Sequence, residues 1–97
     1  MITLINIFTV APERQAELVG LLQAMTDEVT RHLPGFISAS FHRSLDGRHV
    51  ANYAQWESEA AWKAMVRDPK VQARMDPVIG IATFQPRLYE QVSSHHS

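Results

Sequence analysis

Cysteine is absent from the 97-residue sequence, and its absence excludes several classes of site at once. Without a thiolate, the chain cannot form disulfides, bind zinc through sulfur, ligate an iron–sulfur cluster or use a cysteine nucleophile. A glycine-rich phosphate loop, a Gly-x-Ser-x-Gly sequence and a His, Asp and Glu cluster with metal-ligand spacing are missing too. The sequence therefore predicts no metal, flavin or nucleotide held by a standard motif.

The sequence also lacks an excess of charge of either sign and any long apolar run. The formal net charge is −1, so the positive surface that binding to a phosphate backbone requires is missing. No apolar segment approaches the ~20 residues needed to span a bilayer. Residues 1–6 show neither the basic region nor the cleavage site of a signal peptide. We expect a cytoplasmic protein that binds neither nucleic acid nor a membrane.

The length and composition are those of one small globular domain. Hydrophobic residues make up 45% and charged residues 20% of the chain, the ordinary balance of a folded protein. We expect residues 1–92 to form the domain and the polar residues 93–97 to be a disordered tail. A domain of this size buries only about 60–65% of the surface of its unfolded chain, so self-association would stabilise it.

The pattern of apolar residues predicts the order strand, helix, strand, strand, helix, helix, strand. The strands are expected at residues 2–10, 36–45, 48–57 and 81–92. The first helix is expected to begin at Pro12, and the others after N-caps at Ser58 and Asp68, with Pro77 closing the third. With right-handed crossovers, this order gives an α+β ferredoxin-like fold with an antiparallel sheet of strand order 4-1-3-2. Pro86 supports that order, because proline is tolerated in edge strands and the fourth strand is an edge.

Both faces of the predicted sheet are apolar. In the first strand, Leu4 and Phe8 point to one face while Ile5 and Ile7 point to the other, which Tyr53 of the third strand extends. The helices of this fold cover one face only, so the second needs another cover. We expect a homodimer formed through the open sheet face.

Two asparagines interrupt apolar rows on strands that are predicted neighbours. If these rows face the helices, the amides of Asn6 and Asn52 and the indole of Trp56 converge on an apolar space. A buried amide without partners costs about 1–3 kcal/mol, so such groups need a reason to be there. They either bind a ligand, or each amide hydrogen-bonds the backbone or the other amide.

Three further residues are candidates, each with a plainer interpretation. His42 lies in a strand interior and has a pKa range suited to acid–base chemistry, or it is an edge-strand side chain in solvent. The helical spacing of Trp62 favours a core position over a platform for a ligand. Arg74 borders the inner face of the third helix, where it is solvated or supplies a charge at a pocket mouth.

The segments 34–36, 46–47 and 52–58 together resemble the antibiotic biosynthesis monooxygenase family, whose members are small dimeric α+β barrels. These segments read Pro-Gly-Phe, Asp-Gly and Asn-Tyr-Ala-Gln-Trp-Glu-Ser. The last is similar to a segment of the quinone-forming oxygenases of aromatic polyketide pathways. The resemblance covers most of residues 34–69.

The resemblance implies oxidation of a small hydroxylated aromatic substrate, anthrone- or quinol-like, to a quinone by molecular oxygen as co-substrate, without metal, flavin or haem. By this resemblance Asn52 and Trp56 match the pocket donors of the family, and His42 matches a histidine near the substrate. Trp62 stands where similar proteins tend to carry tyrosine, and Arg74 approximately matches an arginine on the last helical segment. The expected catalytic residues are thus Asn52, Trp56 and His42, with Asn6, Trp62 and Arg74 binding substrate.

Other functions on the same scaffold remain open at this point. A quinol oxidase, an isomerase of a small signalling molecule and a non-catalytic dimeric ligand-binding module would all use an apolar pocket with few donors. A haem-degrading branch of the superfamily uses a first-strand asparagine, which Asn6 matches, together with a histidine ligand on the late helix. Residues 70–76 hold no histidine, so haem degradation is disfavoured.

Overall fold

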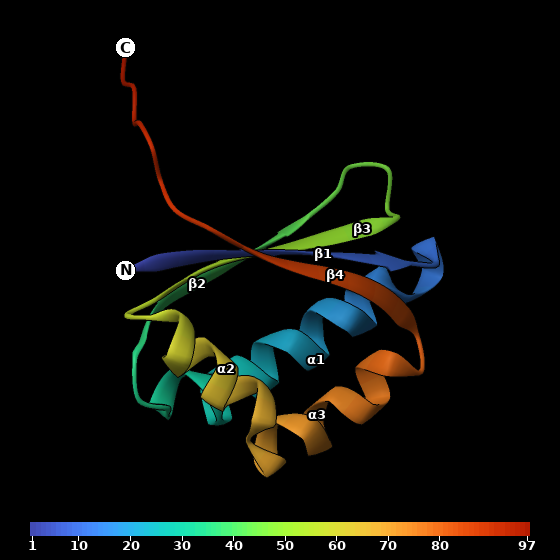
Figure 1. Cartoon of the computed structure of the whole chain (residues 1–97). Coiled ribbons are helices and arrows are strands. Elements are labelled where there is room, and N and C mark those ends of the chain that lie inside the picture. Colours follow the sequence, from blue (N-terminus) through green and yellow to red (C-terminus); the bar gives the residue numbers. More distant parts are fainter.

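A computed structural model describes all residues 1–97 as one antiparallel sheet with every helix on the same face (Figure 1). The strands are β1 (Ile2–Val10), β2 (Phe36–Arg43), β3 (His49–Trp56) and β4 (Ala82–Tyr89), in the sheet order β2-β3-β1-β4. The helices are α1 (Gln15–Glu28), α2 (Glu59–Arg67) and α3 (Pro69–Ile79), with 3₁₀ turns η1 (Pro12–Arg14) and η2 (Thr30–His32) flanking α1. The predicted α+β ferredoxin-like topology is confirmed.

The predicted caps set the starts of α2 and α3. Ser58 Oγ accepts a hydrogen bond from the backbone N–H of Ala61 at 3.1 Å, and Asp68 Oδ1 accepts one from that of Lys70 at 2.8 Å. Each cap satisfies one of the N–H groups that the first turn of a helix leaves unpaired. Because Asp68 also ends α2, the two helices are joined at a sharp corner.

Several predicted boundaries are wrong. The first α-helix begins at Gln15, after the 3₁₀ turn that starts at the predicted Pro12, and β2 ends at Arg43 rather than at residue 45. Pro77 does not close the third helix, because α3 continues through it to Ile79. Proline lacks only the N–H that would bond one turn back, and so close to the helix end this loss disturbs a single bond. The fourth strand was expected over residues 81–92 but ends at Tyr89, which pairs with Thr3. Beyond that pair β1 has almost no residues left to hydrogen-bond, and residues 90–97 form neither helix nor strand.

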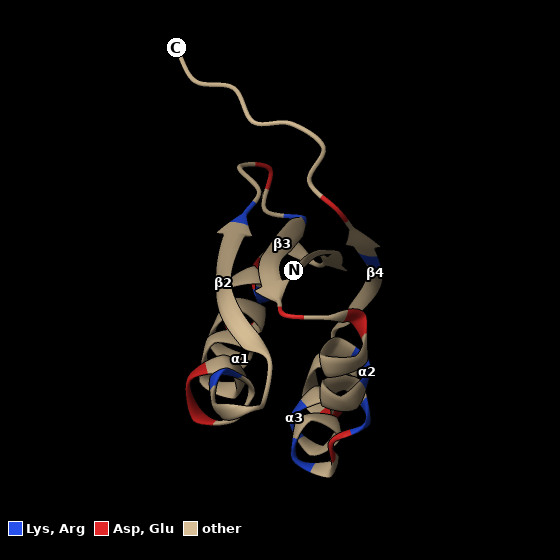
Figure 2. Ribbon diagram, turned by 60° about the vertical axis from the view of Figure 1, so that its left-hand side comes forward, with Lys and Arg blue, Asp and Glu red and all other residues tan.

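The core lies between the sheet and the helices. Trp56, Phe8, Leu18, Leu22, Val50 and Val78 are the largest side chains that are fully buried there. The opposite face of the sheet is open, and Ile7 and Tyr53 on it are 40% and 43% exposed. Figure 2 shows charged residues gathered on the helices and at strand ends, with α1 on one side and α2 and α3 on the other. No helix is both long enough and apolar enough to cross a membrane.

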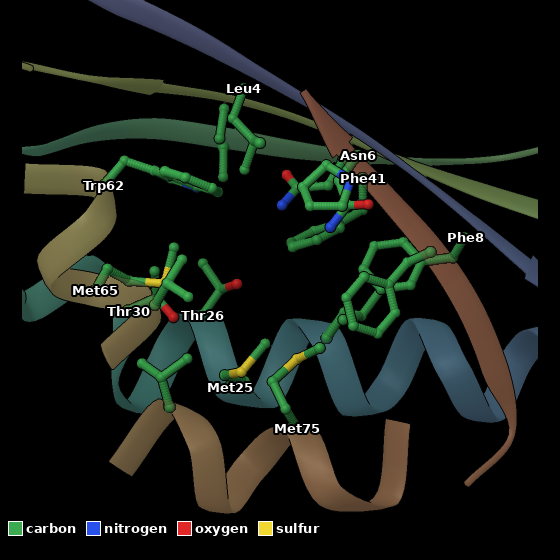
Figure 3. Close-up of a pocket in the computed structure, with 18 of the residues that line it drawn as sticks. Leu4, Asn6, Phe8, Met25, Thr26, Thr30, Phe41, Trp62, Met65 and Met75 are labelled. Carbon is green, nitrogen blue, oxygen red and sulfur yellow. The ribbon is translucent and has the colours of Figure 1, made fainter. Parts of the chain in front are cut away.

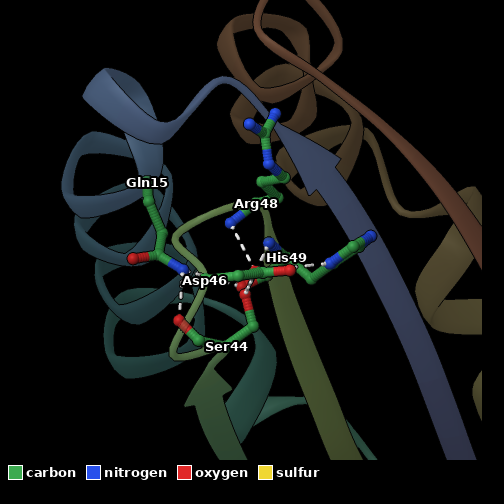
Figure 4. A network of polar contacts seen from close by, with 5 residues as sticks. All are labelled: Gln15, Ser44, Asp46, Arg48 and His49. Carbon is green, nitrogen blue, oxygen red and sulfur yellow. Dashed lines mark hydrogen bonds and ion pairs between the residues drawn. The ribbon is translucent and has the colours of Figure 1, made fainter.

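A polar network fastens the β2–β3 hairpin to α1 (Figure 4). The side-chain amide of Gln15 donates to the carbonyl oxygens of Ser44 and His49 at 3.2 and 2.9 Å. Asp46 accepts hydrogen bonds from the Ser44 hydroxyl at 2.6 Å and from the backbone N–H of Arg48 at 2.9 Å. The Ser44 hydroxyl thus donates to a carboxylate rather than to the His49 imidazole, so this Ser, His and Asp group is a hairpin brace and not a nucleophile site.

This network makes a testable prediction about pH. The hydrogen bond from Ser44, and then that from Arg48, hold the pKa of the Asp46 carboxyl below its ordinary value. Since the folded pKa lies below that of the unfolded chain, the stabilisation is fully present at neutral pH and is lost as the pH falls through the folded pKa. We expect Asp46→Ala to lower the melting temperature at neutral pH. It should have little effect in strong acid, where the Asp46 carboxyl is protonated in both the folded and the unfolded chain.

Thermal melts over the acidic range, with Glu90→Ala as the surface control, measure this difference. An Asp46→Ala penalty that stays constant down to strong acid would contradict the assignment of the pKa shift to the folded hairpin.

Candidate active site

A cavity of about 460 Å³ lies between the sheet and the helices (Figure 3). This volume lies in the range of about 300–1,000 Å³ that small-molecule sites occupy. Hydrophobic residues make up 16 of the 23 that line it, and Asp76 is the only ionisable side chain among them. The cavity is therefore suited to a largely apolar ligand rather than to a charged one.

Asn6 and Asn52 lie on neighbouring strands in the lining of this cavity. The two residues are direct partners in the β1–β3 register, and both line the cavity on the helix-facing side of the sheet. On the outer flank of β1, the residue opposite Asn6 is Pro86, which has no N–H to donate. The carbonyl oxygens of both amides are buried and have no hydrogen-bond partner in the chain.

Two indoles complete the donor set. Trp56 is 1% exposed, and its ring meets that of Phe36 edge-on with centroids 5.4 Å apart, which holds the indole in place. Trp62 reaches the cavity from α2 (Figure 3). The N–H groups of both indoles are buried without an acceptor. Trp62 therefore lines the cavity wall as well as packing beside the core.

All the buried side-chain polar atoms that lack a partner belong to residues lining this one cavity. They are Asn6 Oδ1, Thr30 Oγ1, Asn52 Oδ1, Trp56 Nε1 and Trp62 Nε1. Leaving a buried donor or acceptor unpaired costs about 1–3 kcal/mol, and folded chains retain few of them. Five such atoms around one apolar space are typical of a ligand-binding site, where the partners come from outside the chain.

Amide geometry widens what this cluster can bind. The oxygen and nitrogen of an asparagine exchange places when the terminal amide turns over, at little steric cost. Asn6 and Asn52 can therefore present either a donor or an acceptor to a ligand, whereas the indoles only donate. Such a set suits an oxygen that gains negative charge during a reaction.

His42 does not line this cavity. It pairs with Ala51 in the β2–β3 register, and its neighbour Phe41 pairs with Asn52, so the His42 side chain points to the open face of the sheet. Its imidazole is exposed, with Nε2 3.0 Å from the hydroxyl oxygen of Ser40. The structure places this candidate apart from Asn6, Asn52, Trp56 and Trp62.

Arg74 also stays outside the cavity lining. It forms an ion pair with Glu28, which joins α3 to the end of α1. Both side chains are about half exposed, and such a surface pair contributes little to stability. Within this chain, Arg74 connects two helices that border the cavity rather than facing a ligand.

Several cavity residues were not predicted from the sequence. Three of the four methionines, Met25, Met65 and Met75, contribute flexible thioethers to the walls, and Thr26 and Thr30 contribute hydroxyls. A signal for the threonines was present, because Leu22, Thr26 and Thr30 recur at a spacing of four beside the apolar stripe.

Comparison with known proteins places this geometry in a family. The family model described as antibiotic biosynthesis monooxygenase matches residues 1–76. The tetracenomycin-F1 monooxygenase of Streptomyces glaucescens is 46% identical over 94 residues, covering 97% of this chain and 84% of that protein.

Solved structures agree with this relationship. A monooxygenase from the gene ActVA-Orf6 of Streptomyces coelicolor, in complex with the ligand Nanaomycin D, is 30% identical with a TM-score of 0.86, covering 99% of this chain and 92% of its own. SnoaB of Streptomyces nogalater, described as a cofactor-independent oxygenase, shares the fold with a TM-score of 0.79 at 21% identity, covering 96% of this chain and 94% of its own. The chain is an enzyme of the oxidoreductase class and belongs to the antibiotic biosynthesis monooxygenase family.

Proposed function

We propose that this protein is a cofactor-independent monooxygenase that oxidises a hydroxylated polycyclic or quinol-like aromatic substrate to a quinone. The observation that carries the proposal is the group of five unpaired polar atoms around one apolar cavity. The names of the Streptomyces glaucescens and Streptomyces coelicolor relatives, a tetracenomycin monooxygenase and a monooxygenase that binds Nanaomycin D, support an aromatic polyketide substrate.

The proposed reaction uses the substrate as its own reductant. An anthrone CH₂ loses one proton, and the resulting anion passes one electron to O₂, giving a carbon radical and superoxide. Their combination forms a C–O bond, and protonation yields a hydroperoxide. Loss of the remaining C–H proton with cleavage of the O–O bond then releases water and leaves C=O. One oxygen atom enters the product and the other leaves as water, so atoms and electrons balance.

The cavity residues would promote the first step by stabilising the anion. Asn52 and Trp56 are assigned as donors to the oxygen on which negative charge develops, with Asn6 and Trp62 orienting the ring system. Donors already in place within an apolar, water-poor site stabilise charge far more than water does, because no reorganisation is needed. Because O₂ is apolar, the hydrophobic walls would also favour its binding beside the ring. His42 and Arg74 carry no part in this assignment, since neither lines the cavity.

Oxygen uptake with an anthrone and with a simple quinol, in chelated and cofactor-free buffer, tests the proposal. Uptake well above the spontaneous rate with the anthrone supports a polyketide-type monooxygenase. Uptake with the quinol alone would favour the alternative quinol oxidase. Background rates with both substrates would overturn the proposal and favour an isomerase or a ligand-binding module on the same fold.

We also propose a homodimer formed by two open sheet faces, because apolar side chains remain uncovered there. Sedimentation should give about twice the chain mass of 11.0 kDa. Ile7→Lys, in the middle of that face, should shift the protein to the monomer, because an ammonium would be buried between the sheets. Leu45→Lys, on the fully exposed hairpin, is the control and should stay dimeric. A wild-type monomer at micromolar concentration would contradict the dimer.

A further inference from the structure

Two threonines on the helical side of the cavity carry hydroxyl groups that the proposed reaction does not use. Thr26 lies in the last part of α1 and Thr30 in η2, four residues apart, and both line the cavity. In Figure 3 the Thr26 side chain extends from α1 toward the interior of the cavity. Thr30 is only 8% exposed, and its hydroxyl oxygen has no hydrogen-bond partner in the chain.

The lack of a partner at Thr30 is unusual for its position. A threonine near the end of a helix commonly returns its hydroxyl to the carbonyl four residues earlier. Thr30 makes no such bond and so carries the penalty of an unpaired buried hydroxyl. Valine has nearly the same shape and would fill this site without that penalty. The hydroxyl therefore indicates a partner that comes from outside the chain.

The threonines and the amides stand on opposite walls of the cavity. Asn6 projects from the sheet, whereas Thr26 and Thr30 belong to the helical layer (Figure 3). Asn52 lies beside Asn6 on the neighbouring strand. Most of the lining between the two groups is hydrophobic, with Met25 beside Thr26 in the chain. Polar groups thus line both walls of a largely apolar cavity, with Gln72 and Asp76 of α3 also on the helical side. This arrangement matches a flat ring system with oxygen atoms at both ends.

We infer that Thr26 and Thr30 bind an oxygen substituent on an outer ring of the substrate while the amides hold the oxygen of the reacting ring. This inference rests on the proposed function and specifies its substrate class, a polycyclic aromatic oxygenated on a ring remote from the site of oxidation. A hydroxyl both donates and accepts, so the pair takes a phenol or a ring carbonyl equally well.

Equilibrium binding of stable quinones tests this inference without turnover. The probes are two matched pairs, 2-hydroxy- against 2-methylanthraquinone and 1-hydroxy- against 1-methylanthraquinone, titrated by quenching of tryptophan fluorescence in mildly acidic buffer. Positions 1 and 2 are the two distinct outer-ring positions of this ring system, so both are covered. The wild type should bind one hydroxyl compound about five- to tenfold more tightly than its methyl partner, the gain expected of one or two hydrogen bonds.

Three variants locate that preference. Thr26→Val/Thr30→Val should bind the hydroxyl and methyl compounds equally, and Thr26→Ser/Thr30→Ser should keep the preference because both hydroxyls remain. Thr83→Val, on β4, is the control and should behave as the wild type. Because valine keeps the shape of threonine, each variant should fold, and each single Thr→Val change supplies a second measurement.

Two results would overturn the inference: no hydroxyl preference in the wild type at either position, or an unchanged preference in Thr26→Val/Thr30→Val. Failure of the proposed function is a separate outcome. Absent oxygen uptake with a retained, threonine-dependent hydroxyl preference would remove the monooxygenase assignment and leave the subsite standing.

Discussion

Asn52→Leu should lower kcat for anthrone oxidation by about 100- to 1,000-fold while leaving the protein as stable as the wild type or slightly more stable. The rate loss is the usual consequence of removing one preorganised donor from a developing oxyanion. Stability is preserved because leucine has the same branching and number of side-chain heavy atoms as asparagine, and its bulkier methyl groups can extend into the cavity. The change also removes a buried polar atom that has no partner in the folded chain. The combination of lost activity and retained stability distinguishes a functional amide from a structural one.

Steady-state oxygen uptake and urea unfolding measure the two halves of this prediction. If Asn52 acts on the transition state, kcat and kcat/KM should fall together, with KM little changed. Gln23→Leu, on the exposed side of α1, makes the same amide-to-leucine change and should alter neither quantity. Trp56→Phe should also lose activity, but with a stability cost, since its ring is 1% exposed and packs on Phe36. A destabilised Asn52→Leu with normal turnover would mean that the amide serves the fold.

Gly35→Ala should destabilise the domain by about 2–4 kcal/mol and lower its melting temperature by roughly 10–20 °C. Two costs combine at this turn. Gly35 has φ +85°, in the left-handed region that side chains rarely adopt, and an added Cβ would lie 2.4 Å from the Cβ of Ala61. Neither of these carbons can rotate away, so the backbone of β2 or α2 has to move.

The same change should weaken ligand binding, because Ala61 precedes Trp62 at the start of α2. A shift of this turn moves the indole that lines the cavity. Gly47→Ala is the matched control, since Gly47 has φ +80° but its added Cβ would meet only Pro12, at 3.4 Å. Gly47→Ala should lower the free energy of unfolding by about 1 kcal/mol, because only the unfavourable positive φ contributes at this position. An equal loss of stability in the two variants would show that the structure accommodates the contact between residue 35 and Ala61 without strain.

The fold was predictable because its signals are local. Strand alternation, the N-caps Ser58 and Asp68, and a proline at the sheet edge each depend on neighbours in the chain, and these signals agree with one another. The sequence-based ends of the last two elements are wrong. The third helix continues through Pro77 to Ile79, and β4 ends at Tyr89 because β1 has almost no further residues for pairing.

The site was predictable only in part. Asn6 and Asn52 stood out because each interrupts an apolar row, and antiparallel pairing of neighbouring strands brings such rows together. His42 shows where this reasoning stops. With strict alternation Phe36 and His42 would lie on the same face of the sheet. A register shift between Phe36 and Ser38 places them on opposite faces. A bulge adds one residue to one strand and sends every later side chain to the opposite face.

Local patterns in the sequence predicted the order of the elements and the strand order of the sheet, and they singled out Asn6 and Asn52 as polar residues within apolar rows. Only the folded chain shows that these rows face the helices, that the space beneath the two amides is a cavity lined by Thr26 and Thr30, and that Arg74 pairs with Glu28. The physical reason is one of range. Caps and alternation act between residues close in the chain, whereas the empty volume and the partners of long side chains depend on how separate helices pack across the sheet.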